Sequence, residues 1–245
     1  MNPGTNNSSG IFAIFMGTLP EWDSEVEFIK TYRGPMGFDE AKFLEAAREI
    51  DNVNLDGYEF FTESLKETVQ CKIYRKYDEV SGLYEYKITG LLEDVGLDVC
   101  KNVYMDLEYR KKWDGYVKEL YEFDDDGVKS IYWNVNYPWP MSNRDYVYTR
   151  EMREMEINSI PSVVVLAESN SLSKIPEKSG VVRVKEFHQS LVIQSDAFMH
   201  YFDNPGGSIP TWLINWAAKT GVPTFMNSMR DACLGYEKYT SSKGT

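Results

Sequence analysis

The chain has 245 residues, of which 42% are hydrophobic and 14% are aromatic, so it is long and apolar enough to fold around a substantial core. Its 38 acidic and 26 basic residues give a formal net charge of −12, which argues against nucleic-acid binding and against strong attraction of the whole protein to an anionic membrane. No stretch approaches the roughly 20 apolar residues of a membrane span, and no signal peptide is recognisable, so we expect a cytoplasmic protein.

The residues that usually carry catalysis are sparse. Cys71, Cys100 and Cys233 are odd in number and lack the spacing of metal ligands, which indicates reduced, buried thiols. His188 and His200 lie in strand patterns and are expected to have structural roles. The sequence lacks a Gly-x-Ser-x-Gly nucleophile motif, a phosphate-binding loop and a set of metal ligands. We therefore expect a protein that is not an enzyme and that binds neither a metal nor a cofactor.

Composition divides the chain into three parts. Residues 1–36 are rich in Asn, Gly, Ser and Pro and have no periodicity, which predicts a disordered N-terminal extension. Residues 37–240 contain neither an internal repeat nor a linker and are expected to form one domain. Residues 241–245 are expected to be a disordered tail.

Within this domain, the first predicted element is a helix from Asp39, a good N-cap residue, to about Ile50. Alternating aromatic and β-branched residues then predict strands over 58–63, 71–75 and 83–88, the last two forming a hairpin. One helix is predicted over 97–109. Further strands follow, mostly joined by short turns, over 117–123, 130–137, 145–155, 162–169, 181–194 and 197–203. Consecutive hairpins imply a meandering antiparallel sheet and an α+β fold.

The C-terminal part is predicted to be helical. Pro210 suits the first turn of a helix, Gly221 is expected to interrupt it, and Pro223 to restart it. Apolar residues then recur at helical spacing and form one stripe, made by Val222, Phe225, Met226, Met229, Cys233 and Tyr236. Such a stripe is typical of a helix packed on a sheet.

A distinctive stretch runs from Tyr132 to Tyr148 and contains six aromatic residues, two prolines and an Arg-Asp pair. Its pattern Tyr-Pro-x-Pro-x-Ser-x-Arg-Asp resembles the central signature of the START family of lipid-binding domains. Further motifs that resemble this family follow in the right order and include Tyr-Arg-Lys-Lys-Trp-Asp over 109–114, Gly-Val-Val-Arg-Val over 180–184, Phe-Asp-Asn-Pro-Gly-Gly over 202–207 and Trp-Leu-Ile-Asn-Trp over 212–216. The resemblance extends from Phe38 to Tyr239.

The resemblance implies a helix-grip fold, in which a curved antiparallel sheet of roughly nine strands surrounds a lipid tunnel. It also implies that the long C-terminal helix closes the mouth of the tunnel. This membrane gate would be formed by Trp212, Trp216, Val222, Phe225, Met226 and Met229.

The members of the family that carry phosphatidylcholine imply a head-group site in this chain. Choline is a methylated cation that aromatic faces attract, and the resemblance assigns its cage to Trp133, Tyr146 and Phe187. Phe187 stands where the family usually has Tyr, so the π face is kept and a hydroxyl is lost. Without the resemblance, these three residues would be interpreted as ordinary core aromatics.

The phosphate of such a lipid is best held by a guanidinium group. The resemblance assigns this role to Arg110 with Asp114 as its acidic partner, and further head-group and ester contacts to Tyr104 and Gln189. Without the resemblance, Arg110 and Asp114 would be interpreted as a surface ion pair at i,i+4 spacing.

Through the family resemblance, these residues imply a monomeric protein that binds a single phosphatidylcholine in an internal tunnel and transfers it between membranes through transient membrane contact. The alternative is a phosphatidylcholine-sensing adaptor of the same fold, which would regulate a partner such as an acyl-CoA thioesterase. Both need the same cavity, so the sequence leaves them open. A hydrolase acting on lipid esters is disfavoured because no nucleophile motif is present.

Overall fold

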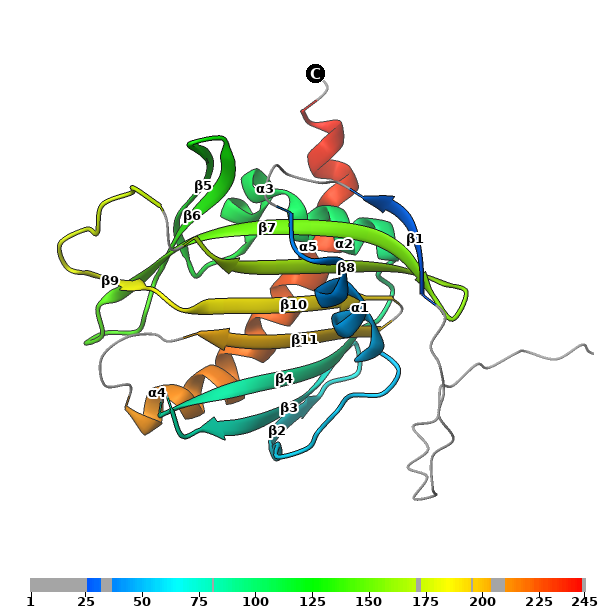
Figure 1. Ribbon diagram of the computed structural model, residues 1–245, viewed down its shortest axis with the longest axis horizontal. Helices are drawn as coiled ribbons and strands as arrows, with labels where there is room; N and C mark the ends of the chain where they lie inside the picture. The colour runs from blue at the N-terminus through cyan, green and yellow to red at the C-terminus, as the bar shows by residue number, and fades with distance from the viewer. Residues whose placement is uncertain are drawn as a thin grey trace, which may run out of the picture.

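The computed structural model describes residues 26–31, 37–80, 82–170, 173–194, 196–203 and 210–243. Its strands form one mixed sheet of eleven strands (Figure 1): β1 (Val26–Thr31), β2 (Glu59–Leu65), β3 (Val69–Asp78), β4 (Leu83–Leu92), β5 (Val117–Asp125), β6 (Val128–Val135), β7 (Asn143–Ile157), β8 (Ile160–Ser169), β9 (Val181–Val184), β10 (Phe187–Ile193) and β11 (Asp196–Asp203). The helices are α1 (Glu40–Arg48), α2 (Leu97–Met105), α3 (Leu107–Trp113), α4 (Thr211–Trp216), the π-helix η1 (Ala217–Gly221) and α5 (Val222–Ser241).

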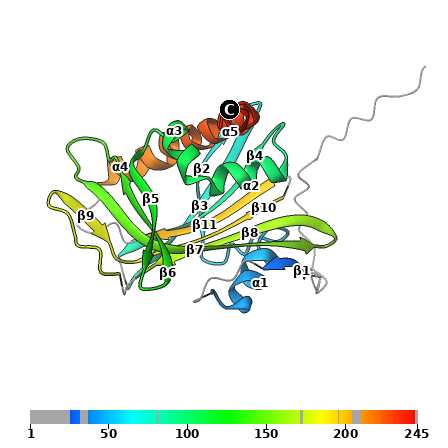
Figure 2. The ribbon, with the colours of Figure 1, turned by 90° about the horizontal axis from the view of Figure 1, so that it is seen from above.

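Nine strands follow one another across the sheet in the order β2-β3-β4-β11-β10-β8-β7-β6-β5. The long helix α5, orange to red in Figure 1, crosses this sheet on the same side as α2 and α3. Seen from above, α1 lies on the opposite face (Figure 2). The α+β architecture and the C-terminal helix packed on an antiparallel sheet are therefore confirmed.

Both faces of the sheet are buried near its centre, and the strand β8 is accordingly apolar at consecutive positions from Val163 to Leu166. Val163 and Val165 pack in the cluster beneath α2 and α5, whereas Val164 and Leu166 pack in the cluster beneath α1. Because side chains of a strand alternate between the two faces, a strand covered on both sides needs a continuous apolar run.

The longest strand, β7, organises the sheet by pairing with two strands along each edge. On one edge β6 pairs with its first half and β1 with its end, at Val26↔Ile157. On the other edge β9 pairs with its beginning and β8 with the rest. The Asn158-Ser159 turn between β7 and β8 has positive φ at both residues, as a tight two-residue hairpin requires.

Three predictions about strands and termini were wrong. Residues 26–31, assigned to the disordered extension, form β1, because a short β-branched and aromatic run finds an open edge on β7. The predicted strand over 181–194 is two strands, and the first, β9, pairs with β7 in parallel, unlike the rest of the sheet. The tail over 241–245 is ordered at its start, since α5 ends at Ser241 and Lys243 still donates its amide to Thr240.

The helices also differ from their predictions. The helix predicted over 97–109 is divided at Asp106, whose carboxylate accepts the amide of Tyr109 at 2.8 Å and thereby caps α3. Gly221 does not interrupt the C-terminal helix, because η1 joins α4 to α5 without a break in helical backbone. A wider π turn just before Pro223 suits a residue that has no amide hydrogen to donate.

We expect Asp106→Ala to lower the free energy of unfolding by about 1–2 kcal/mol, because α3 loses its N-cap and the Tyr236 hydroxyl loses an acceptor at 3.3 Å. Urea denaturation followed by circular dichroism measures the change. The matched control is Asp39→Ala, which removes the exposed cap of α1 and its single bond to the amide of Ala41. Equal losses for the two variants would contradict a role for Asp106 beyond simple capping.

Candidate functional site

Arg110 is a buried cation at the end of α3. Its Nε donates to Oδ2 of Asp114 at 3.0 Å, and the two side chains are 9% and 1% exposed. Burial alone would lower the pKa of Arg110, but Asp114, Tyr148 and Tyr104 together raise it above its ordinary value. Arg110 therefore stays charged inside the protein, and the interpretation of a surface ion pair is wrong.

The position of Asp114 is unusual for an acidic residue. It caps the C-terminus of α3, where the helix dipole disfavours negative charge. Two donors offset this cost, since Oδ1 accepts the amide of Tyr116 at 3.0 Å and Oδ2 accepts from Arg110. The Asp114 carboxylate therefore stabilises the charge of Arg110 and does not stabilise the helix dipole of α3.

Three aromatic rings surround the Arg110 guanidinium. Its Cζ lies 4.8 Å from the ring centre of Trp133 on β6, 5.5 Å from Phe225 on α5 and 6.0 Å from Tyr104 on α2. These distances are those of cation–π contacts. One buried cation therefore joins the sheet, α2 and the C-terminal helix, and Phe225 places a predicted gate residue directly on the predicted phosphate site.

The structure brings together the three aromatics that were predicted to form the choline cage. The ring centres of Trp133 and Tyr146 are 5.0 Å apart, and those of Tyr146 and Phe187 are 5.5 Å apart. The three residues come from β6, β7 and β10 and point to the face that α5 crosses. Such packing suits either a cage or an apolar core, so their role stays a prediction.

Two residues of β7 belong to this region and were missed from the sequence. Tyr148 is buried, and its ring centre lies 5.3 Å from that of Phe187. Burial raises the pKa of the Tyr148 hydroxyl, although Arg150 and Arg110 oppose this. Arg150 donates to the backbone carbonyls of Tyr104 and Met105 at 3.3 and 3.0 Å. The two-residue period of a strand starting at Tyr146 was the signal that could have found both.

Tyr104 and Gln189, the other predicted head-group residues, touch each other. Nε2 of Gln189 on β10 donates to the Tyr104 hydroxyl on α2. Gln189 and Phe187 are two residues apart on one strand, so they share the face on which Arg110 lies. All seven residues predicted for the head group thus line one region between the sheet and the helices α2, α3 and α5.

The predicted gate residues occupy different environments. Met226 packs on β4 so closely that a Cβ at Gly90 would lie 2.5 Å from its Cε. Phe225 contacts Trp113 with ring centres 5.5 Å apart. Met229 is buried, Val222 and Trp216 are half-buried, and Trp212 is 47% exposed. The C-terminal helix therefore has a buried, core-forming part and an exposed aromatic at its N-terminal end.

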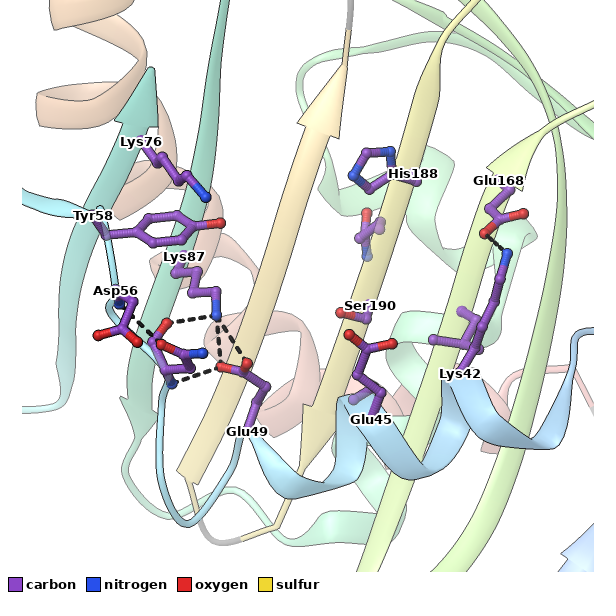
Figure 3. Close-up of a pocket in the computed structure, with 14 residues that line it drawn as sticks. Lys42, Glu45, Glu49, Asp56, Tyr58, Lys76, Lys87, Glu168, His188 and Ser190 are labelled. Carbon is purple, nitrogen blue, oxygen red and sulfur yellow. Dashed lines mark hydrogen bonds and ion pairs between the residues drawn. The ribbon is translucent and has the colours of Figure 1, made fainter. Parts of the chain in front are cut away.

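A separate polar pocket of about 400 Å³ lies on the opposite face, between α1 and the sheet (Figure 3). Nζ of the buried Lys87 donates to both carboxylate oxygens of Glu49 at 2.9 and 2.8 Å, and Lys42 pairs with Glu168 at 2.5 Å. These charges neutralise each other within the protein and anchor α1 to the sheet. This pocket does not suit an apolar ligand, and we do not assign the predicted site to it.

His188 lies in this polar pocket, and burial lowers its pKa. The side chain of His200 is outside the described residues, as are residues 204–207 of the Phe-Asp-Asn-Pro-Gly-Gly motif. Within the described part of the chain, no group of three or more His, Cys, Asp and Glu side chains is gathered around a possible metal position. No helix in that part has the length and apolar character needed to cross a membrane.

A curved sheet that grips a long C-terminal helix, with a buried guanidinium and aromatic rings between them, defines a ligand-binding protein of the helix-grip class. Comparison with known families makes this more specific, because the START domain matches residues 45–239. The chain therefore belongs to the START domain family.

Similar proteins include the phosphatidylcholine transfer proteins of Rattus norvegicus and Homo sapiens. They are 51% and 50% identical to this chain over 209 residues, which is 83% of the chain and 97% of each relative. A more distant relative, the human mitochondrial StAR-related lipid transfer protein 7, is 29% identical over 77% of the chain and 54% of its own length.

Solved structures support the fold. The crystal structure of human STARD10 has a TM-score of 0.67 and 22% identity, with 84% of each chain covered. Human StAR-related lipid transfer protein 5 has a TM-score of 0.57 and 15% identity, covering 80% of this chain and 97% of its own.

We expect Asp114→Ala to lower the free energy of unfolding by about 3–5 kcal/mol, because it leaves the buried Arg110 without its anionic partner. Chemical denaturation measures the loss. The matched control is Glu108→Ala, which breaks the exposed ion pair with Lys111 on the same helix and should cost under about 1 kcal/mol. A loss for Asp114→Ala as small as that of the control would mean that Arg110 is reached by solvent.

Proposed function

We propose that this protein binds a single phosphatidylcholine molecule between its sheet and its C-terminal helix and transfers it between membranes. The observation that carries the proposal is the buried Arg110, surrounded by aromatic rings of the sheet and of α5, in a START chain. The identity of 51% with a phosphatidylcholine transfer protein over most of both chains supports the same ligand.

The chemistry of the region matches the two charges of this lipid. Arg110 is a charged group in a buried site, where a phosphate is held more strongly than in water. Trp133, Tyr146 and Phe187 offer aromatic faces for a trimethylated cation. The indole Nε1 of Trp133 is buried and has no hydrogen-bond partner among the described residues, so it is suited to donate to a lipid oxygen.

The apolar lining supports the carrying of acyl chains. Two chains of about 16 carbons would cost on the order of 25 kcal/mol to expose to water, at about 0.8 kcal/mol per methylene. The face beneath α5 is lined by residues such as Val69, Val163, Val165 and Leu191. We infer that the protein acts without catalysis and without a cofactor, because carriage and release break no bond.

The alternative function is a sensor that binds the same lipid and regulates a partner such as an acyl-CoA thioesterase. A carrier must deliver its lipid to acceptor vesicles, whereas a sensor has only to bind it. Delivery from donor to acceptor vesicles therefore separates the two. We further infer a monomer in the cytoplasm, where the three free cysteines would remain reduced.

We expect Arg110→Ala to abolish extraction of phosphatidylcholine from vesicles, because the lipid phosphate loses its buried cation. Trp133→Ala should weaken binding by roughly 1–2 kcal/mol and affect phosphatidylcholine more than phosphatidylethanolamine, whose ammonium can use hydrogen-bond acceptors instead. Phe187→Tyr should be tolerated or mildly favourable. Labelled lipids extracted from mixed vesicles provide the measurement, with circular dichroism to verify folding.

The matched control for Arg110→Ala is Arg153→Ala. Arg153 is also buried and pairs with Glu151 at 3.0 Å, but it lies on the face that α1 covers, over the ring of Phe43. Arg153→Ala should lower the free energy of unfolding and leave the extraction of phosphatidylcholine unchanged. If Arg110→Ala and Trp133→Ala both extract phosphatidylcholine normally and with unchanged selectivity, the head-group assignment is wrong.

We expect the half-exposed Trp212 on α4 to be a point at which the protein contacts the membrane. Trp212→Ala should reduce binding to phosphatidylcholine vesicles, since indole rings favour the boundary between lipid and water. Co-sedimentation with vesicles measures the fraction of protein bound. Ile160→Ala is the control, because Ile160 is also 47% exposed but begins β8, at the opposite end of the sheet from α4 (Figure 1). Equal binding by all three proteins would exclude Trp212 from the contact.

A further inference from the structure

The indole N–H of Trp113, the last residue of α3, is a buried hydrogen-bond donor. Its Nε1 is shielded from solvent and makes no hydrogen bond to any of the described residues. A buried donor of this kind has lost its hydrogen bonds to water and gained none in return, so folded proteins normally pair such groups. Within the described part of the chain, the protein supplies a donor here without supplying the acceptor.

Trp113 lies beside the candidate phosphate site. It follows Arg110 by three residues on α3, so the two side chains share one face of that helix. The ring centre of Phe225 on α5 lies 5.5 Å from that of Trp113 and 5.5 Å from Cζ of Arg110. The indole and the guanidinium therefore approach the same ring of the C-terminal helix.

Trp113 also belongs to the apolar surroundings of α5. It packs against the cluster that contains Val69, Val163, Val165 and Leu191, the face proposed for the acyl chains. The indole N–H is thus placed where a buried cation and an apolar lining meet.

The order of these groups is also the order of groups along a diacyl phospholipid. In such a lipid the phosphate is followed by glycerol with two ester carbonyls, and then by the acyl chains. Arg110 suits the phosphate, and the apolar cluster suits the chains. An indole N–H is a neutral donor and an ester carbonyl is a neutral acceptor, so pairing them buries no further charge.

We propose that the indole N–H of Trp113 donates to an ester carbonyl of the bound lipid and thereby favours diacyl phosphatidylcholine over its ether-linked analogue. This inference rests on the proposed function, because it takes a phosphatidylcholine as the ligand beneath α5. The ether-linked lipid has the same head group and chains but lacks both carbonyl acceptors. Binding it would leave the N–H of Trp113 unpaired, at the cost that any buried donor without an acceptor carries.

Tyr109 on the same helix offers a matched control. Its hydroxyl is also a buried donor between α3 and α5, but it donates to the backbone carbonyl of Ala232 at 3.0 Å. Tyr109→Phe therefore removes a donor that the protein itself pairs. Trp113→Phe removes the unpaired N–H and keeps an aromatic ring against Phe225.

The experiment titrates the full-length protein with vesicles that contain labelled diacyl or labelled dialkyl phosphatidylcholine of equal chain length. The measured quantity is the ratio of the two affinities. Trp113→Phe should lower this ratio roughly three- to tenfold, because one neutral hydrogen bond is lost to the diacyl lipid only. Tyr109→Phe should leave the ratio unchanged. An ester contact made by Tyr104 or Gln189 would raise the ratio in all three proteins alike and would not imitate the effect.

A second measurement needs no substitution. In protein labelled with ¹⁵N-tryptophan, each of the six tryptophans gives one indole signal, and that of Trp113 is assigned through its contact with the ring of Phe225. Diacyl phosphatidylcholine should move this N–H proton downfield, as a new hydrogen bond does, and the dialkyl lipid should not. This signal decides the matter if Trp113→Phe fails to fold.

Two results would overturn the proposal. One is an affinity ratio that Trp113→Phe leaves unchanged, and the other is an indole signal that responds equally to both lipids. If the unsubstituted protein binds both lipids equally well, ester recognition by Trp113 is refuted while the proposed function stands. If it binds neither lipid, the proposed function itself fails and the inference falls with it.

Discussion

The buried guanidinium of Arg110 is the constraint on which the helical side of the structure depends. Removing a charged group from water costs several kcal/mol, so the fold must supply partners that repay it. Asp114 supplies the opposite charge, and Trp133 and Phe225 supply aromatic faces. These partners come from the end of α3, from the sheet and from α5, so neither the sheet nor the C-terminal helix can shift without weakening the environment of this one cation.

Much of the fold could be predicted because its signals are local. Turn residues and alternation located the hairpins, as at β5–β6, where Asp124 accepts the amide of Gly127 and Gly127 has a φ of 85°. The N-cap at Asp39 fixed the start of α1 in the same way. The motifs of the START family supplied what local patterns lack, namely that Arg110, Trp133 and Phe187 lie in one region of the fold.

What could not be predicted depends on distant contacts. The strand over 26–31 forms by pairing with an open edge of β7. That edge is more than 120 residues away along the chain, so the sequence around 26–31 does not predict the pairing. The division at Asp106 reflects a cap that also accepts the hydroxyl of Tyr236, 130 residues later. The contact of Phe225 with Arg110 is of the same kind, since helical spacing places Phe225 on an apolar face but does not say which cation that face meets.

The C-terminal helix is part of the core, and in the proposed function it is also the cover of the lipid site. Met229, Ala232 and Tyr239 are buried, and Met226 fills the space above Gly90. Lifting such a helix in water would expose this apolar surface at about 25 cal/mol per Å². A bilayer removes much of that cost, because its interior is as apolar as the face that α5 covers. With a net charge of −12, the whole protein is not drawn to anionic membranes, so the proposed membrane contact would depend on an exposed aromatic such as Trp212 rather than on charge. In the proposed function, opening of α5 would thereby be coupled to the membrane surface, where a lipid can be exchanged.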